Sequence, residues 1–158
     1  MRKITPFLWY ERGAEEAAAF YVSLFPNSHV DHVTRSATET PSGPAGSVLT
    51  VEFTLAGHKF IALNGGVDFP FTEAVSFQIG CEDQEEVDRL WAALTEGGTE
   101  SQCGWLKDRW GLSWQVVPKR LPQLLGDPDP ARARRATEAL LTMKKIVVAD
   151  LERAADGG

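Results

Sequence analysis

The chain repeats one order of predicted elements, and this repetition limits the folds that it can adopt. Residues 4–66 show a strand, a helix and three further strands, and residues 75–118 show a strand, a helix and shorter strands. A unit of about 50 residues that occurs twice is typical of a modular fold. We therefore predict a single domain over residues 1–158, in which the two modules are followed by a helical tail at about 119–158.

The first module combines alternating strands with one amphipathic helix. Apolar residues recur at three- and four-residue steps between Ala14 and Phe25, as on a helix that packs one face against a core. Pro26 ends this helix. Around it, strand-forming residues alternate with polar ones. The predicted strands are Ile4–Tyr10, His29–Ala37, Ser47–Leu55 and Lys59–Asn64, with a hairpin turn at Ala56–His58.

The second module has clearer signals for where its elements begin and end. Asp83, followed three residues later by Glu86, is predicted to cap a helix, and Gly97 is predicted to stop that helix. A tight turn is expected at Gly111. The predicted strands are Val75–Cys81, short strands within Thr99–Asp108, and Leu112–Val117.

The tail contains structure-breaking prolines and then two segments with helical spacing. The expected helices are Ala131–Met143 and Lys144–Ala155, after breaks at Pro122, Pro128 and Pro130. Leu140, Met143, Ile146 and Val147 form an apolar stripe. Such a stripe is expected to dock onto the domain or onto a partner subunit.

The composition argues against several classes of function. Sixteen basic and 22 acidic residues give a net charge of −6, which does not favour a nucleic-acid surface. No apolar run approaches the roughly 20 residues that span a bilayer, and no signal-peptide core follows Met1, so no membrane contact is expected. Two cysteines, Cys81 and Cys103, are too few for a disulfide framework. We predict a cytoplasmic protein with reduced thiols.

Each predicted sheet has an apolar and a polar face. Successive side chains of a strand point to opposite faces, and the apolar face is expected to pack against the helices. The expected helix-facing residues are Phe7, Trp9, Leu49, Val51, Phe53, Ile61, Leu63, Phe77, Ile79, Trp114 and Val116. The expected opposite residues are Thr50, Glu52, Thr54, Asn64, Ser76, Gln78, Ser113 and Gln115. A curved sheet would make this second face a cup with a few convergent polar groups, as ligand sites have.

Several segments between residues 4 and 118 match one protein superfamily. They are Ile4-Thr5-Pro6-Phe7-Leu8-Trp9-Tyr10, Ala19-Phe20-Tyr21, Ser23-Leu24-Phe25-Pro26-Asn27-Ser28, Ala62-Leu63-Asn64-Gly65-Gly66, Ser76-Phe77 with Cys81-Glu82-Asp83, and Gly104-Trp105-Leu106-Lys107-Asp108 to Pro118. With them the chain resembles the vicinal oxygen chelate (glyoxalase/bleomycin resistance/dioxygenase) superfamily, and within it the PhnB-like branch. The resemblance implies an α+β fold of two βαβββ modules, with curved mixed sheets around a central cup and helices outside. It also implies a homodimer.

Metal-dependent members of this superfamily use four ligands, one from the first and one from the last strand of each module. The matching positions hold Pro6, Ala62 (or Asn64, if the register shifts by two), Ser76 and Gln115. Proline and alanine have no side-chain donor, serine is a poor ligand, and only Gln115 is a residue type seen at these positions. We therefore expect no metal and no other cofactor.

The residues and the resemblance together predict a metal-free, dimeric protein that binds a small molecule. The ligand itself is unknown at this point. The predicted ligand-binding residues are Gln115, Gln78, Ser76, Asn64 and Glu52 as hydrogen-bonding groups, with Leu8, Tyr10 and Trp105 as walls.

The alternative is an enzyme that acts on a small substrate in the same cup. It would be a glyoxalase- or dioxygenase-type lyase, or the 3-demethylubiquinone-9 3-methyltransferase for which some relatives are named. Acid–base catalysis needs a titratable group with a tuned pKa, and only Glu52 and Tyr10 are candidates. Neither has a recognisable partner, so the catalytic residues are unknown. The glycines at Gly43–Gly46 and Gly65–Gly66 fit a loop and a turn better than a methyl-donor site.

Overall fold

Two four-stranded sheets, one in each half of the chain, carry the fold. The structure is a computed structural model and describes residues 2–158. The chain divides into a first unit that ends at Pro70 and a second unit that begins at Phe71. Each unit has the order strand, helix and three strands, which confirms the predicted α+β repetition.

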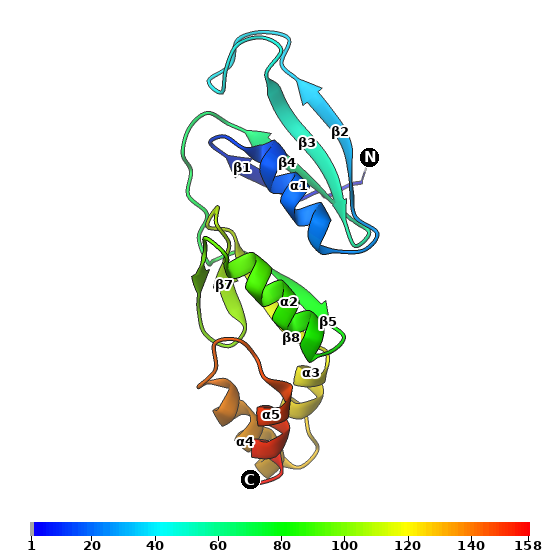
Figure 1. Ribbon diagram of the computed structural model, residues 1–158, viewed down its shortest axis with the longest axis vertical. Coiled ribbons are helices and arrows are strands. Elements are labelled where there is room, and N and C mark those ends of the chain that lie inside the picture. The colour runs from blue at the N-terminus through cyan, green and yellow to red at the C-terminus, as the bar shows by residue number, and fades with distance from the viewer. Residues whose placement is uncertain (1) are drawn as a thin grey trace. The chain divides into compact units, whose positions relative to one another are not determined.

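In the first unit, helix α1 (Ala14–Leu24) covers one face of a sheet with the strand order β1-β4-β3-β2. Strand β3 (Val48–Leu55) pairs antiparallel with both β2 (His29–Arg35) and β4 (His58–Asn64). Strand β1 (Phe7–Tyr10) pairs with β4 in parallel, as a strand does when a helix and further strands separate it from its neighbour. Figure 1 shows α1 lying across the strands of this sheet.

The predicted faces of the first sheet are right for β3 and wrong for β1 and β4. Val51 and Phe53 are at most 1% exposed and lie on the α1 side. The register places Leu8 beside Ala62 and Ala62 beside Val51, so these three residues share that side. The residues that lie instead on the opposite side, with Glu52, are Phe7, Trp9, Ile61 and Leu63.

Continuous apolar runs explain this error. The segments Phe7–Tyr10 and Phe60–Leu63 are apolar at every position, so a period of two does not show which set faces the helix. Strand β3 does alternate between apolar and polar residues, so the side chains that face the helix are predicted correctly.

In the second unit, α2 (Gln84–Thr95) lies against a sheet with the strand order β5-β8-β7-β6. These strands are β5 (Ser76–Cys81), β6 (Thr99–Glu100), β7 (Trp105–Lys107) and β8 (Ser113–Pro118). Asp83 caps α2 as predicted, because its carboxylate accepts a hydrogen bond from the Glu86 N–H at 2.9 Å. Figure 1 shows α2 beside β5 and β8.

The predicted faces of the second sheet are confirmed. Phe77 pairs with Trp114, and Leu106, which also pairs with Trp114, is 1% exposed on the helix side. We call the opposite side the polar face. It consists of Ser76, Gln78, Trp105, Lys107, Ser113 and Gln115.

The tail forms three helices that belong to the second unit, α3 (Arg120–Leu125), α4 (Pro130–Leu140) and α5 (Val148–Ala155). Helix α3 is missing from the prediction because Pro122 was expected to interrupt any helix. Pro122 lies in the first turn of α3, where proline is tolerated. The tail has a core of its own, made of Val117, Leu121, Leu124, Ala136, Leu140, Ile146, Leu151 and Ala155.

The predicted helix from Lys144 begins only at Val148, because the preceding segment is used for docking. The Met143 and Lys144 carbonyls accept hydrogen bonds from the N–H groups of Cys103 and Gly104, both at 2.8 Å. Gln84 on α2 bonds both the Ile146 carbonyl and the Val148 N–H. The tail therefore docks onto its own unit, and a helical backbone here would lose these bonds.

Over residues 2–158, no helix combines the length and the apolar character that crossing a bilayer requires.

Replacing Ile146 with alanine tests how strongly the tail is docked. Ile146 is 0% exposed, and truncation of a buried aliphatic side chain costs about 2–5 kcal/mol. We expect Ile146→Ala to lower the free energy of unfolding by that amount in urea denaturation. Leu141 is 65% exposed in the same tail, so Leu141→Ala should change it by less than about 0.5 kcal/mol. Equal effects of the two substitutions would contradict the docked tail.

Candidate functional site

The turn between β7 and β8 is built around one buried carboxylate. Asp108 is 3% exposed. Its Oδ1 accepts hydrogen bonds from the N–H groups of Trp110 at 2.9 Å and Leu112 at 3.1 Å, and its Oδ2 accepts from Trp114 Nε1 at 2.9 Å. Gly111 completes the turn with φ of 85°, a conformation that glycine adopts without strain. This turn sets which side chains of β8 reach the polar face.

At the centre of the polar face, two predicted ligand residues bond each other. Gln115 Nε2 donates to Ser76 Oγ at 2.9 Å, and Gln115 is only half-buried. Its neighbours across the strands are Gln78, which is exposed, and Trp105. An amide has two donors and an acceptor oxygen, so Gln115 keeps bonding capacity beyond the bond to Ser76.

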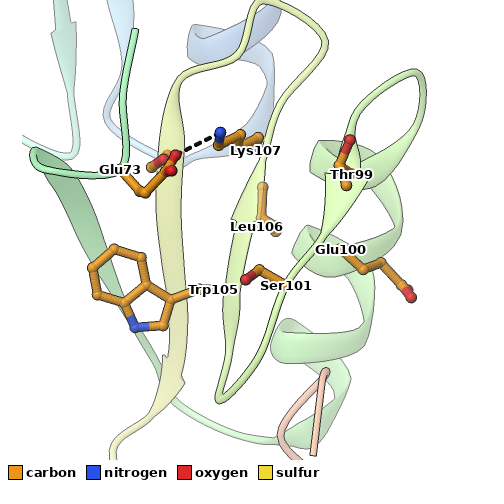
Figure 2. A pocket seen from close by; sticks show the side chains of 8 residues that line it. Glu73, Thr99, Glu100, Ser101, Trp105, Leu106 and Lys107 are labelled. Carbon is orange, nitrogen blue, oxygen red and sulfur yellow. Dashed lines mark ion pairs between the residues drawn. The ribbon is translucent and has the colours of Figure 1, made fainter.

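Beside these residues the second unit contains a hollow of about 350 Å³. Its rim carries an ion pair in which Lys107 Nζ lies 2.5 Å from Glu73 Oε2, and Figure 2 shows these two side chains pointing toward each other. The hydrogen bond from Lys107 holds the pKa of Glu73 below its usual value, so Glu73 is ionised at neutral pH. The lining residues are Glu73, Thr99, Glu100, Ser101, Trp105, Leu106, Lys107 and Ser113.

Ser113 is the unusual member of the hollow. It is 1% exposed, and within residues 2–158 its hydroxyl has no hydrogen-bond partner. A buried polar group without a partner costs about 1–3 kcal/mol, and most buried polar groups are therefore bonded. Alternation places Ser113 on this face, but its lack of a partner is visible only in three dimensions.

The residues predicted for the site from the first unit have other surroundings. Asn64 is 7% exposed, and its amide accepts from the Ala14 N–H at 2.9 Å and donates to Glu15 Oε1 at 2.6 Å, which anchors the start of α1. Tyr10 is buried, with its hydroxyl 3.1 Å from that of Tyr21. The prediction that Asn64 lies opposite the helix is wrong, because β4 has the reverse phase.

Leu8 and Glu52 lie on opposite sides of the first sheet. Leu8 is 5% exposed and packs on the α1 side. Glu52 is half-buried on the other side, between His32 and Ile61 in the strand register. Of the first unit's predicted site residues, Glu52 alone therefore keeps the orientation expected for it.

The side chains at the superfamily's metal positions do not fit a metal ion. Pro6 and Ala62 offer no donor atom, and Ala62 is 0% exposed. Ser76 and Gln115 bond each other. Residues 2–158 contain no group of three or more His, Cys, Asp or Glu that could hold a metal ion. A catalytic ion is normally held by three protein ligands, which this donor set does not supply.

The surroundings of the two free thiols, Cys81 and Cys103, do not point to a nucleophile. Burial raises the pKa of the Cys81 thiol to about 12, so the thiol stays protonated near neutral pH. Cys103 is half-buried, and its Sγ lies 3.6 Å from the Leu140 carbonyl oxygen, at the junction with the tail. Both thiols therefore have surroundings that suit packing.

Replacing Asp108 tests the carboxylate at the β7–β8 turn. Asp108→Ala removes the acceptor for three N–H groups, two of them in fully buried bonds. We expect the free energy of unfolding to fall by about 3 kcal/mol in urea denaturation, because buried donors left without partners are costly. The control is Asp83→Ala, which removes a single helix cap worth about 1 kcal/mol. An equal loss in both variants would contradict the central role of Asp108.

The sequence model of one protein family, described as "3-demethylubiquinone-9 3-methyltransferase", matches residues 2–117. Among curated proteins, none matches the chain. A PhnB protein from Bacillus cereus of known structure is 36% identical and has a TM-score of 0.68, with 74% of this chain and 99% of that protein covered. The helical tail follows the last residue that the family model matches.

Two more distant structures are also similar to this chain, and the first of them shares its fold. A protein from Pseudomonas aeruginosa is 17% identical with a TM-score of 0.61, over 75% of this chain and 98% of that one. A glyoxalase/bleomycin resistance protein from Albidiferax ferrireducens T118 is 12% identical with a TM-score of 0.48, over 73% and 96% of the two chains. The chain belongs to the family described as 3-demethylubiquinone-9 3-methyltransferase, as a PhnB-like member.

Proposed function

We propose that this PhnB-like protein is a metal-free, homodimeric binding protein for a small molecule, and that its polar face is the binding surface. The observation that carries the proposal is the Gln115–Ser76 pair, which lies half-buried beside Trp105 and the hollow. Ligand sites combine apolar or aromatic walls with a few convergent polar groups. The polar face has this composition.

The chemistry of the polar face supports binding rather than catalysis. Gln115, Gln78 and Ser76 offer donors and acceptors, but amides and hydroxyls do not ionise near neutral pH. The titratable groups nearby, Glu73 and Lys107, are paired with each other. General acid–base catalysis needs a titratable group placed and tuned for the substrate. These side chains are arranged to recognise a molecule.

The family description favours methyl transfer as the second candidate function. The surroundings of Gly65 do not support it. A Cβ atom at Gly65 would lie 2.1 Å from the Trp9 indole, so the chain's own side chain occupies the space beside this glycine. A donor site that uses glycine needs that space for the cofactor. A methyl donor could therefore not use the space beside Gly65.

Gln115→Ala tests the binding surface. We expect small polar aromatic fragments to shift the NMR signals of the Gln115 and Gln78 amides. Gln115→Ala should lower the affinity for these fragments about tenfold, which is the effect of one lost hydrogen bond. Gln123→Ala, an exposed glutamine on α3, should leave their affinity unchanged. The proposal fails if no fragment shifts the Gln115 and Gln78 signals, or if the two substitutions change the affinity equally.

Divalent ions provide the outcome that would overturn the metal-free part of the proposal. An ion that binds at 100 times its Kd stabilises a protein by about 2.7 kcal/mol, which raises Tm by several degrees. We expect Zn²⁺, Ni²⁺, Mn²⁺ and Fe²⁺ to change Tm by less than about 1 °C. Stoichiometric metal that Gln115→Ala removes would contradict this expectation.

The homodimer is supported by apolar residues at both edges of the first sheet. Phe7 on the edge strand β1 is 55% exposed, and Val30 and Val33 on the edge strand β2 are 42% and 38% exposed. An exposed apolar edge strand is a surface along which a second chain can pair. Sedimentation equilibrium should give twice the 17.3 kDa chain mass, and Phe7→Glu or Val33→Glu should shift it toward one chain. A single-chain mass for the unsubstituted protein would contradict the dimer.

A further inference from the structure

We infer that the hollow is a subsite for an organic carboxylate on an aromatic ring, and that this carboxylate replaces Glu73 as the partner of Lys107. The inference rests on the proposed function, because it names the chemical class of the ligand. Three features of the second unit carry it: an unpartnered hydroxyl, a displaceable ion pair and an aromatic wall.

The unpartnered hydroxyl belongs to Ser113. The strand register places Ser113 directly beside Lys107 on β7 and beside Ser76 on β5, so all three side chains lie on the polar face. The Ser113 Oγ is buried without a partner and lines the hollow. The Oγ is buried while the Lys107–Glu73 pair is in place, so a ligand oxygen would accept the one hydrogen bond that this hydroxyl donates after Glu73 has moved.

The ion pair shows where the hollow accepts a carboxylate. The Lys107 and Glu73 side chains are 41% and 66% exposed, and ion pairs exposed to this degree contribute little to stability. A competing carboxylate can therefore displace Glu73 at low cost. The ammonium group has three donors, so it can hold a ligand oxygen that also reaches Ser113.

The backbone decides which partner moves. Lys107 lies on β7, between two hydrogen-bonded strands, whereas Glu73 lies in a turn before β5. The cation is therefore held in place by the sheet, and the anion is carried by a turn. This asymmetry favours an anionic ligand at Lys107 over a cationic ligand at Glu73.

The other acidic group of the hollow does not oppose an anion directly. Glu100 Oε1 accepts a hydrogen bond from Trp91 Nε1 on α2 at 2.8 Å, and its partner in the strand register is Leu106, which faces that helix. Lys107 is the only cationic residue that lines the hollow in the described part of the chain.

Trp105 is the reason that we expect the ligand to carry an aromatic ring. It lies two residues before Lys107 on β7, so both side chains are on the polar face, and its indole is half-buried. Aromatic rings pack against an indole in stacked or tilted geometry. A hollow of about 350 Å³ lies within the range of small-molecule sites.

Three matched probes test the charge preference on the full chain. They are phenylacetate, phenylacetamide and 2-phenylethylamine, which carry negative, zero and positive charge on one ring system. We expect phenylacetate to shift the NMR signals of the Trp105 indole and the Ser113 amide with a Kd of about 1 mM. Phenylacetamide should bind about tenfold more weakly. Equal affinity of these two probes, or preference for the amine, would overturn the inference.

Substitutions then assign the contacts. Lys107→Met should remove the preference for phenylacetate over phenylacetamide. Glu73→Gln should raise the affinity for phenylacetate several-fold, because it removes the carboxylate that competes for Lys107. The control is Glu82→Gln at the exposed Lys119–Glu82 pair of the same unit, which should change nothing. Weaker binding in Glu73→Gln would show that Glu73 helps to hold the ligand and would overturn the displacement.

Ser113→Ala separates a ligand contact from a structural role. This substitution should lower the affinity for phenylacetate about threefold. It should also leave Tm unchanged or raise it, because the hydroxyl bonds no protein group. A fall in Tm without loss of affinity would contradict the role of Ser113.

The two proposals can fail separately. If phenylacetate and phenylacetamide bind equally and both depend on Gln115, the binding surface stands and the carboxylate subsite falls. If phenylacetate binding depends on Lys107 and not on Gln115, the subsite stands and the assignment of the polar face falls.

Discussion

The buried carboxylate of Asp108 is the interaction on which the proposed site depends. By accepting from Trp110, Leu112 and Trp114, it closes the β7–β8 turn and holds the Trp114 indole on the helix side of the sheet. Because side chains alternate along β8, fixing Trp114 on one side places Ser113 and Gln115 on the other. One polar group in the core thereby determines which groups lie on the polar face.

The polar groups of this protein fall into two kinds, and hydrogen bonding separates them. Asp108 and Asn64 are buried with their acceptors used by the chain, which is what structural polar groups require. Ser113 is equally buried and bonds no group within residues 2–158, while Gln115 uses part of its hydrogen-bonding capacity on Ser76. Since unbonded buried groups destabilise the fold, Ser113 is the residue to test first as a ligand contact.

Family membership and the chain's own residues answer different questions. The family accounts for the two βαβββ units. The positions that the resemblance implies as metal ligands carry Pro6, Ala62, Ser76 and Gln115 here. The tail lies beyond the match to the family and packs Ile146 into the second unit. Recognition chemistry must therefore be read from this chain, because a shared fold does not imply a shared reaction.

The sequence alone was sufficient for the order of elements within the two modules and for the family, but it missed helix α3 in the tail. It was also sufficient for the faces of the second sheet, because β5 and β8 alternate between apolar and polar residues. It was insufficient for β1 and β4, whose continuous apolar runs hide the phase, and this displaced Leu8, Tyr10 and Asn64 from the predicted site. It also contained no sign of the Lys107–Glu73 pair or of the unbonded Ser113 hydroxyl. Those depend on which distant segments meet, and local periodicity carries no information about contacts between residues far apart in the chain.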